Sequence, residues 1–116
     1  MAGYYKFKIE KDADGYRFFL LPNNSNTQPV GISAEAYDSY SECKDALEEF
    51  RSVMSLNPAE SLLRVYKIDT AGHVDAKLVH GDNIIFNRKG STTGGKTECK
   101  KWAERIKKNI NAVLIV

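Results

Sequence analysis

The sequence has few of the residues that build metal sites and disulfide frameworks. Its 116 residues include only two cysteines and two histidines. These residues lack the C-x-x-C or H-x-x-x-H spacing that makes a zinc site a strong prediction. Cys43 and Cys99 instead occupy matching places in two similar segments, which favours small core residues over a disulfide. We predict no metal and no cofactor.

Long hydrophobic runs are also missing. The N-terminus has no apolar stretch of signal-peptide length, and the closing run Ala112–Val116 is far shorter than the roughly 20 residues that cross a bilayer. We expect no membrane partner and a cytoplasmic location. The run follows a predicted helix closely, so we expect a short strand that pairs inside the fold or between chains.

Catalytic constellations are absent from the pattern as well. Several carboxylates lie at predicted turns or on a wet strand face, with no base, nucleophile or metal group around them: Asp12, Asp14, Asp69 and Asp75. Such residues are ordinarily solvated. We therefore predict no catalytic residue and no enzyme activity.

The length suits one compact domain. Two independent domains of about 58 residues would each be only marginally stable. The chain nevertheless contains two similar units, about residues 4–57 and 60–116. Phe7–Glu10 recurs as Tyr66–Asp69, Gly15 recurs as Gly72, and Ser41–Lys44 recurs as Thr97–Lys100. We expect one domain, residues 1–116, in which both units share a core.

Hydrophobic periodicity predicts three strands and one helix in each unit. Period-two runs bounded by turn residues predict strands at 5–10, 16–21, 30–33, 63–68, 74–79 and 84–87. Period-3.6 stripes then predict two helices, the first with Cys43, Ala46, Leu47, Phe50, Val53 and Met54 inward, the second with Cys99, Trp102, Ala103, Ile106 and Ile110. Ser39 and Glu42 form a capping-box pattern, and the segment 55–58 ends the first helix.

These elements predict an α+β fold: two tandem β-β-β-α-β repeats form one largely antiparallel sheet, with two helices packed on one face. The helices exchange residue sizes, because Ala46 matches Trp102 and Leu47 matches Ala103. In a shared core, a large side chain would fill space left by a small one. We therefore expect Trp102 to be buried.

Three features carry a family resemblance: the tandem strand-turn-strand pattern, Ala34–Tyr37 after Ser33, and the helix end Ile106–Asn109. In these features the chain resembles the YegP-like family of small bacterial proteins. The resemblance implies β-β-β-α-β units in a single sheet with exchanged C-terminal strands, and it implies no activity or site residues. This chain departs from the pattern in the polar loop 23–28 and at 91–94.

A phosphate-binding motif matches residues 90–97. Gly90-Ser91-Thr92-Thr93-Gly94-Gly95-Lys96-Thr97 fits G-x-x-x-x-G-K-T. Nucleotide hydrolysis is the least supported interpretation, because such enzymes need a parallel sheet and a metal-holding acid on another strand. A flexible connection to a helix start is the plain alternative. Between these lies an anion site at the helix N-terminus, with Gly95, Lys96 and Thr97 as candidates.

Charge is distributed unevenly along the chain. Residues 1–58 carry a net charge of −3 and residues 59–116 carry +5. An ordinary solvated helix face explains the basic cluster, with cations near the helix C-terminus. The alternative is a polyanion-binding face, with candidates Arg88, Lys89, Lys100, Lys101, Arg105 and Lys108. Nucleic-acid signatures are lacking. We predict a non-catalytic binding or interaction module, with a protein partner or self-association.

Overall fold

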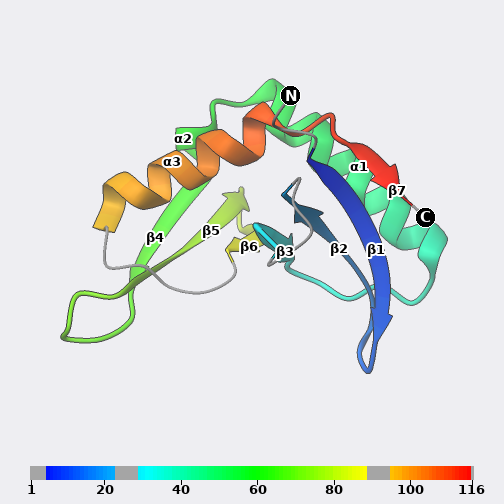
Figure 1. Ribbon diagram of the computed structural model, residues 1–116, viewed down its shortest axis with the longest axis horizontal. Helices are drawn as coiled ribbons and strands as arrows, with labels where there is room; N and C mark the ends of the chain where they lie inside the picture. The colour runs from blue at the N-terminus through cyan, green and yellow to red at the C-terminus, as the bar shows by residue number, and fades with distance from the viewer. Residues whose placement is uncertain (1–4, 23–28, 89–94, 116) are drawn as a thin grey trace.

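The computed structural model describes residues 5–22, 29–88 and 95–115. Ten elements follow one another along the chain (Figure 1). They are β1 (Lys6–Asp12), β2 (Gly15–Leu21), β3 (Gly31–Ser33), α1 (Tyr40–Leu56), α2 (Ala59–Leu62), β4 (Leu63–Lys67), β5 (Val74–His80), β6 (Asn83–Arg88), α3 (Gly95–Lys108) and β7 (Val113–Ile115). No helix in these ranges is long and apolar enough to span a membrane.

The strands form one seven-stranded sheet in the order β4-β5-β6-β3-β2-β1-β7. All neighbours are antiparallel except β1 and β7, which run parallel. α1 packs against β1 and β2, while α3 packs against β4 and β5 (Figure 1). The predicted mixed α+β fold with a mostly antiparallel sheet is confirmed.

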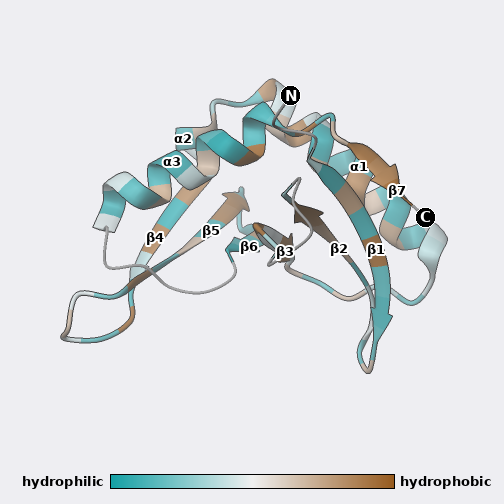
Figure 2. Ribbon diagram, in the orientation of Figure 1, coloured by the Kyte–Doolittle hydropathy of each residue, from teal (hydrophilic) through white to brown (hydrophobic). Residues whose placement is uncertain are grey.

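Strand register places the large apolar side chains on the face that the helices cover. Phe7 lies opposite Leu20, and Phe86 lies opposite Leu78. The strands and helices carry teal and brown bands where hydrophilic and hydrophobic residues follow one another, and β2 is mostly brown (Figure 2). The predicted helix stripes are buried at Cys43, Leu47, Phe50, Met54, Cys99, Trp102, Ala103 and Ile106. Period-3.6 patterning thus located the buried faces of both long helices correctly.

Trp102 joins the two halves of the chain in one core. It is 5% exposed, as predicted, and its ring stacks on Phe86 with centroids 6.4 Å apart. Its indole Nε1 donates a hydrogen bond of 2.8 Å to the carbonyl of Val30, 72 residues away. Buried side chains from both halves belong to one cluster.

The segment after α1 differs from the prediction. A β-β-β-α-β unit requires a fourth strand there, but residues 59–62 form the short helix α2 and continue directly into β4. Pro58 is its N-cap, while Ala59 and Leu62 are buried in the core. α1 also runs to Leu56, and the Asn57 side chain donates to the carbonyl of Val53. Burial of two apolar side chains fixes this connection as helix.

The repeat match in the fourth strand is wrong in register. Tyr66 and Ile68, matched to the buried Phe7 and Ile9, are 42% and 53% exposed. Leu63 and Val65 face the helices instead, paired with Leu78 and Ala76. The shift is three residues, and an odd shift moves every side chain to the other face.

Candidate functional site

The predicted polyanion-binding residues do not share one surface. Lys101, Arg105 and Lys108 line a groove of about 930 Å³ beside Tyr5. Lys100 faces a different groove, next to β4. Lys89 lies outside the described residues.

Arg88 lies on the side of β6 that the helices cover. It is half-buried, and its register partner Gly31 lies on the same face as Leu20. Burial raises the pKa of the nearby Cys99 thiol, while the Arg88 charge lowers it. Arg88 thus adjoins the core rather than the exposed face of α3.

Two cations of α3 have structural partners. Arg105 lies over the ring of Tyr5, 5.2 Å from its centroid, and also donates to the Tyr5 hydroxyl. Lys107 Nζ donates to the carbonyls of Met54 and Asn57, at 2.8 and 2.5 Å. Lys107 therefore supplies donors at the C-terminal end of α1, where helix carbonyls lack partners.

The phosphate-loop motif lies largely outside the described residues, since residues 89–94 are not among them. α3 begins at Gly95, which has a φ of +69°. The strand before the motif, β6, has antiparallel neighbours on both sides, β3 and β5. The parallel sheet that nucleotide hydrolases of this class use is therefore not present around β6. The anion site at Gly95, Lys96 and Thr97 stays a prediction.

A groove of about 550 Å³ lies between β4 and α3, and we call it the β4 groove. Its lining is Glu60, Leu63, Arg64, Val65, Lys67, Gly72, Val74, Lys96 and Lys100. Leu63, Val65 and Val74 are half-buried and pack against the core, so they provide an apolar floor. Lys96 and Lys100 come from the first turns of α3, and Arg64 and Lys67 come from β4. The groove thus combines one residue from each predicted anion-binding set, Lys96 and Lys100, with an apolar surface.

Small side chains on this side of the sheet leave room for the groove. Where α1 crosses β2, Tyr16 and Tyr40 pack edge to face, with ring centroids 6.4 Å apart. Where α3 crosses β5, the corresponding positions near the strand and helix starts hold Val74 and Lys96. A branched aliphatic and a flexible ammonium fill less space than two aromatic rings.

In the part of the chain that the structure describes, the outer edge of β4 carries backbone groups without partners. The amide of Ile68 donates to the carbonyl of His73, so alternation directs the groups of Tyr66 and Arg64 toward β5 as well. The backbone N–H and C=O groups of Val65 and Lys67 must then point away from β5. Among the described residues, none bonds the N–H or C=O of either. β4 is the terminal strand of the sheet, so these groups form an open edge.

The groove has an excess of positive charge. Lys100 pairs with Glu60 at 3.4 Å, and both side chains are more than half exposed. Arg64 Nη1 donates to the carbonyls of Ser61 and Leu63. Four cations line the groove against the single anion Glu60. Such exposed pairs contribute little stability, so the cations remain able to bind a ligand.

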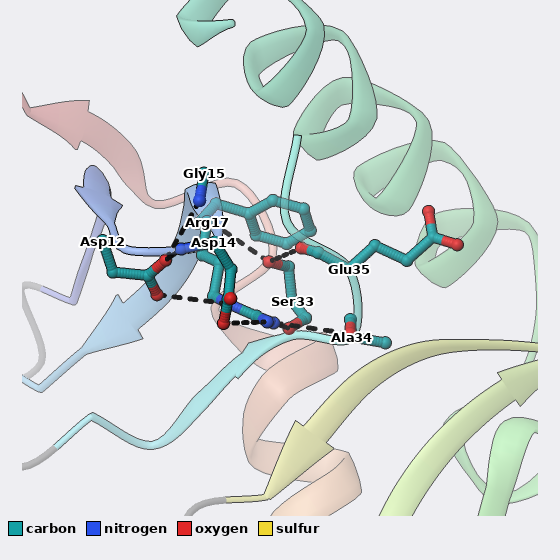
Figure 3. Close-up of polar contacts among 8 residues, drawn as sticks. Asp12, Asp14, Gly15, Arg17, Ser33, Ala34 and Glu35 are labelled. Atoms are coloured by element: carbon teal, nitrogen blue, oxygen red, sulfur yellow. Dashed lines mark hydrogen bonds and ion pairs between the residues drawn. The ribbon is translucent and has the colours of Figure 1, made fainter. Parts of the chain in front are cut away.

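The turn carboxylates serve the fold. Asp12 Oδ1 accepts the amides of Asp14 and Gly15, at 2.8 and 3.2 Å (Figure 3). Gly15 has a φ of +136°, and a Cβ there would lie 2.6 Å from the carbonyl oxygen of Tyr37. This close approach requires glycine.

Arg17 extends this network to the segment that carries the family resemblance. Its guanidinium pairs with Asp12 at 3.3 Å and donates to the carbonyls of Ser33 and Ala34 (Figure 3). The Ser33 hydroxyl donates to the carbonyl of Glu35 and accepts the amide of Phe18. In the second half, Asp69 similarly accepts two turn amides and contacts His73 at 2.8 Å. No group of three metal-binding side chains occurs in residues 5–22, 29–88 and 95–115.

Sequence reasoning missed the groove itself. It identified Lys96 and Lys100, but through two separate arguments. No periodicity indicates that β4 is an edge strand, because strand order depends on long-range pairing. The contrast of Tyr16 and Tyr40 with Val74 and Lys96 was a usable signal, had the two units been aligned strand by strand.

Comparison with known proteins identifies the fold. No protein-family model and no curated protein matches the chain. The solution NMR structure of a UPF0339 protein from Shewanella oneidensis is similar, with a TM-score of 0.66 and 14% identity over 95% of this chain and 88% of that one. That of YegP from E. coli, a protein of unknown function, has a TM-score of 0.65 and 19% identity over 98% and 91%. The resemblance predicted from sequence is thus confirmed for the fold, and these similar structures indicate no catalytic or other specific function.

Proposed function

We propose that this chain is a non-catalytic interaction module that binds an extended segment of a partner protein at the β4 groove. The observation that carries the proposal is the open edge of β4, where the outward N–H and C=O groups of Val65 and Lys67 flank an apolar floor. An extended segment that adds to a sheet edge gains backbone hydrogen bonds, and pockets beside the edge select its side chains.

Selection of peptides by display tests this function. A random peptide library selected on the wild-type protein should enrich binders that are lost on Val65→Pro. Proline removes one outward N–H and is tolerated on an edge strand when that N–H faces solvent. Val65→Thr keeps the N–H and should retain the binders. Enriched peptides that bind Val65→Pro and wild type equally would contradict the proposal.

We further propose that the fold derives from two repeated units, the first of which has lost its closing strand. Reciprocal contacts support this. Arg51 of α1 donates to the carbonyl of Ala112 after α3, while Lys107 of α3 donates to Met54 and Asn57 at the end of α1. Arg51 and Lys107 are 56 residues apart, the same offset as Cys43 and Cys99. A two-fold relation between the units accounts for both.

Polyanion binding is the second candidate function. The groove lined by Lys101, Arg105 and Lys108 beside Tyr5 favours it, because an aromatic ring among cations suits nucleotides. Fluorescence anisotropy with single- and double-stranded oligonucleotides tests it, and binding should weaken steeply with salt. An absence of binding at low ionic strength would remove this candidate. Membership of the YegP-like family, a bacterial source and a cytoplasmic location stay part of the proposal.

A further inference from the structure

We infer that the segment bound at β4 is acidic, with carboxylates and aliphatic side chains on the same face, and that it adds to the sheet as an eighth strand. This inference rests on the proposed function and specifies the chemistry of the partner. It follows from the placement of backbone groups, apolar floor and cations in the β4 groove.

The backbone of β4 sets the geometry of the ligand. Val65 and Lys67 direct donors and acceptors outward at a spacing of two residues. Only an extended chain presents its own groups at that spacing, since alternate residues of a strand point to the same side. A helix bonds its own backbone groups internally and cannot match this edge.

The apolar floor and the cations beside it determine which side chains the ligand carries. Val65 faces the helix-covered side beside Leu63 and Val74, so a ligand residue on that side contacts aliphatic surface. Lys96 and Lys100 of α3 line the groove next to this floor. A carboxylate two residues along the segment lies on the same side as the aliphatic residue and reaches Lys96, Lys100 or Lys67. Charge complementarity of this kind mainly governs specificity and the association rate.

The same charges disfavour a second copy of this chain as the occupant. Pairing β4 with β4 of another molecule would bring two Arg64 and two Lys67 side chains into one interface. Like charges opposite each other in a sheet are destabilising. Cations on an edge strand also discourage sheet-to-sheet association. An acidic segment of a different protein meets neither penalty.

Three synthetic peptides of one length test the inference on the intact protein. One repeats serine-valine-serine-glutamate, so that valine and glutamate share one face of the extended chain. The second replaces each glutamate with lysine, and the third replaces it with threonine. Amide NMR spectra of the ¹⁵N-labelled protein report where each binds. We expect the glutamate peptide to shift Val65 and Lys67 at the lowest concentration, and the lysine peptide to leave them unchanged.

Two matched charge variants locate the recognition. Lys96→Glu with Lys100→Glu should weaken binding of the glutamate peptide by about tenfold, since two exposed pairs become repulsive. Lys101→Glu with Lys108→Glu makes the same charge change on the same helix, outside the β4 groove, and should leave binding within about twofold. Equal loss in both variants would show general charge attraction and overturn the inference.

The outcomes separate the inference from the proposed function. If the threonine or lysine peptide shifts Val65 and Lys67 as strongly as the glutamate peptide, the groove binds strands without regard to charge and the inference fails alone. If no peptide shifts these amides, both fail. If the amides shift with protein concentration before any peptide is added, a second copy occupies the edge and the inference is wrong.

Discussion

Gly31 is fixed by the aromatic ring that lies against it. A Cβ at this position would lie 2.2 Å from Cε2 of Phe86. Phe86 cannot retreat, because it stacks on Phe50 at 4.6 Å and on Trp102 at 6.4 Å between ring centroids. The strand pair β3–β6 joins the two halves of the sheet at this point.

We predict that Gly31→Ala lowers the free energy of unfolding by about 1–3 kcal/mol, as overpacking does in close-packed cores. Urea denaturation measures the loss. Phe86→Leu provides the control, because a smaller side chain makes room for the methyl group. The double variant should then lose less than the sum of the single losses, and strict additivity would refute the contact as the cause.

The Cys43 thiol makes the free energy of unfolding depend on pH in the alkaline range. Burial raises the pKa of its thiol to about 11. Below the ordinary thiol pKa, the thiol is protonated in both the folded and the unfolded chain, and its contribution to the free energy of unfolding is complete. As pH rises toward 11, the unfolded chain releases the proton first, so stability is lost.

We predict that Cys43→Ala loses less stability than wild type between pH 8 and pH 10.5. The difference should approach about 2 kcal/mol, since one pKa unit corresponds to about 1.4 kcal/mol. Denaturant unfolding at both pH values measures it, and parallel curves for the two proteins would contradict the buried-thiol explanation. Thiol reagents should likewise modify Cys43 only in the unfolded chain.

Residue patterns predicted burial well where one face dominates. The helix stripes were predicted correctly, including Trp102, because the period of 3.6 leaves one inward face. The faces of the strand on which Tyr66 and Ile68 lie were not predicted correctly. An alternating strand fits either register equally well, and the pairing of Leu63 with Leu78 decides between them.

At the scale of elements, a cation of α3 holds the end of α1, and a cation of α1 holds the segment that follows α3. Lys107 of α3 donates to two carbonyls at the end of α1, and Arg51 of α1 donates to the carbonyl of Ala112. Arg51 also lies over the Phe7 ring at 5.2 Å. Helix carbonyls at a C-terminus need donors, and a cation there also opposes the helix dipole.

We predict that Lys107→Met lowers the free energy of unfolding by about 1–2 kcal/mol, since two charge-assisted hydrogen bonds are lost. Methionine keeps the length and apolar stem of the side chain. Lys108→Met is the matched control on the next residue and should change stability by less than about 0.5 kcal/mol. Thermal unfolding followed by circular dichroism compares them, and equal losses would show that helix propensity, not the bridge, is responsible.

The short helix α2 shows the limit of element prediction. Four residues cannot form a stable helix by propensity, because helix nucleation is unfavourable. Ala59 and Leu62 are buried, and tertiary burial supplies the stability. The phosphate-loop motif at residues 90–97 shows the converse, since a local pattern matched while the antiparallel sheet around β6 did not supply its usual context.

The whole molecule is organised around one core with an edge strand on each side. β7 pairs with β1 at one edge, while β4 ends the other. Sequence length and patterning predicted the shared core, because each half alone would be only marginally stable. Strand order and the β4 groove followed only from the structure, since both depend on contacts between distant residues.

The account depends on both halves unfolding as one cooperative unit, and native-state hydrogen exchange of the intact chain tests this directly. The most protected amides of β2 and of β5 should open with one free energy, equal to that of global unfolding, because Trp102 and Phe86 tie both strands to one core. If the free energies of opening of the most protected amides in β2 and in β5 differ by about 2 kcal/mol or more, the result would contradict the account.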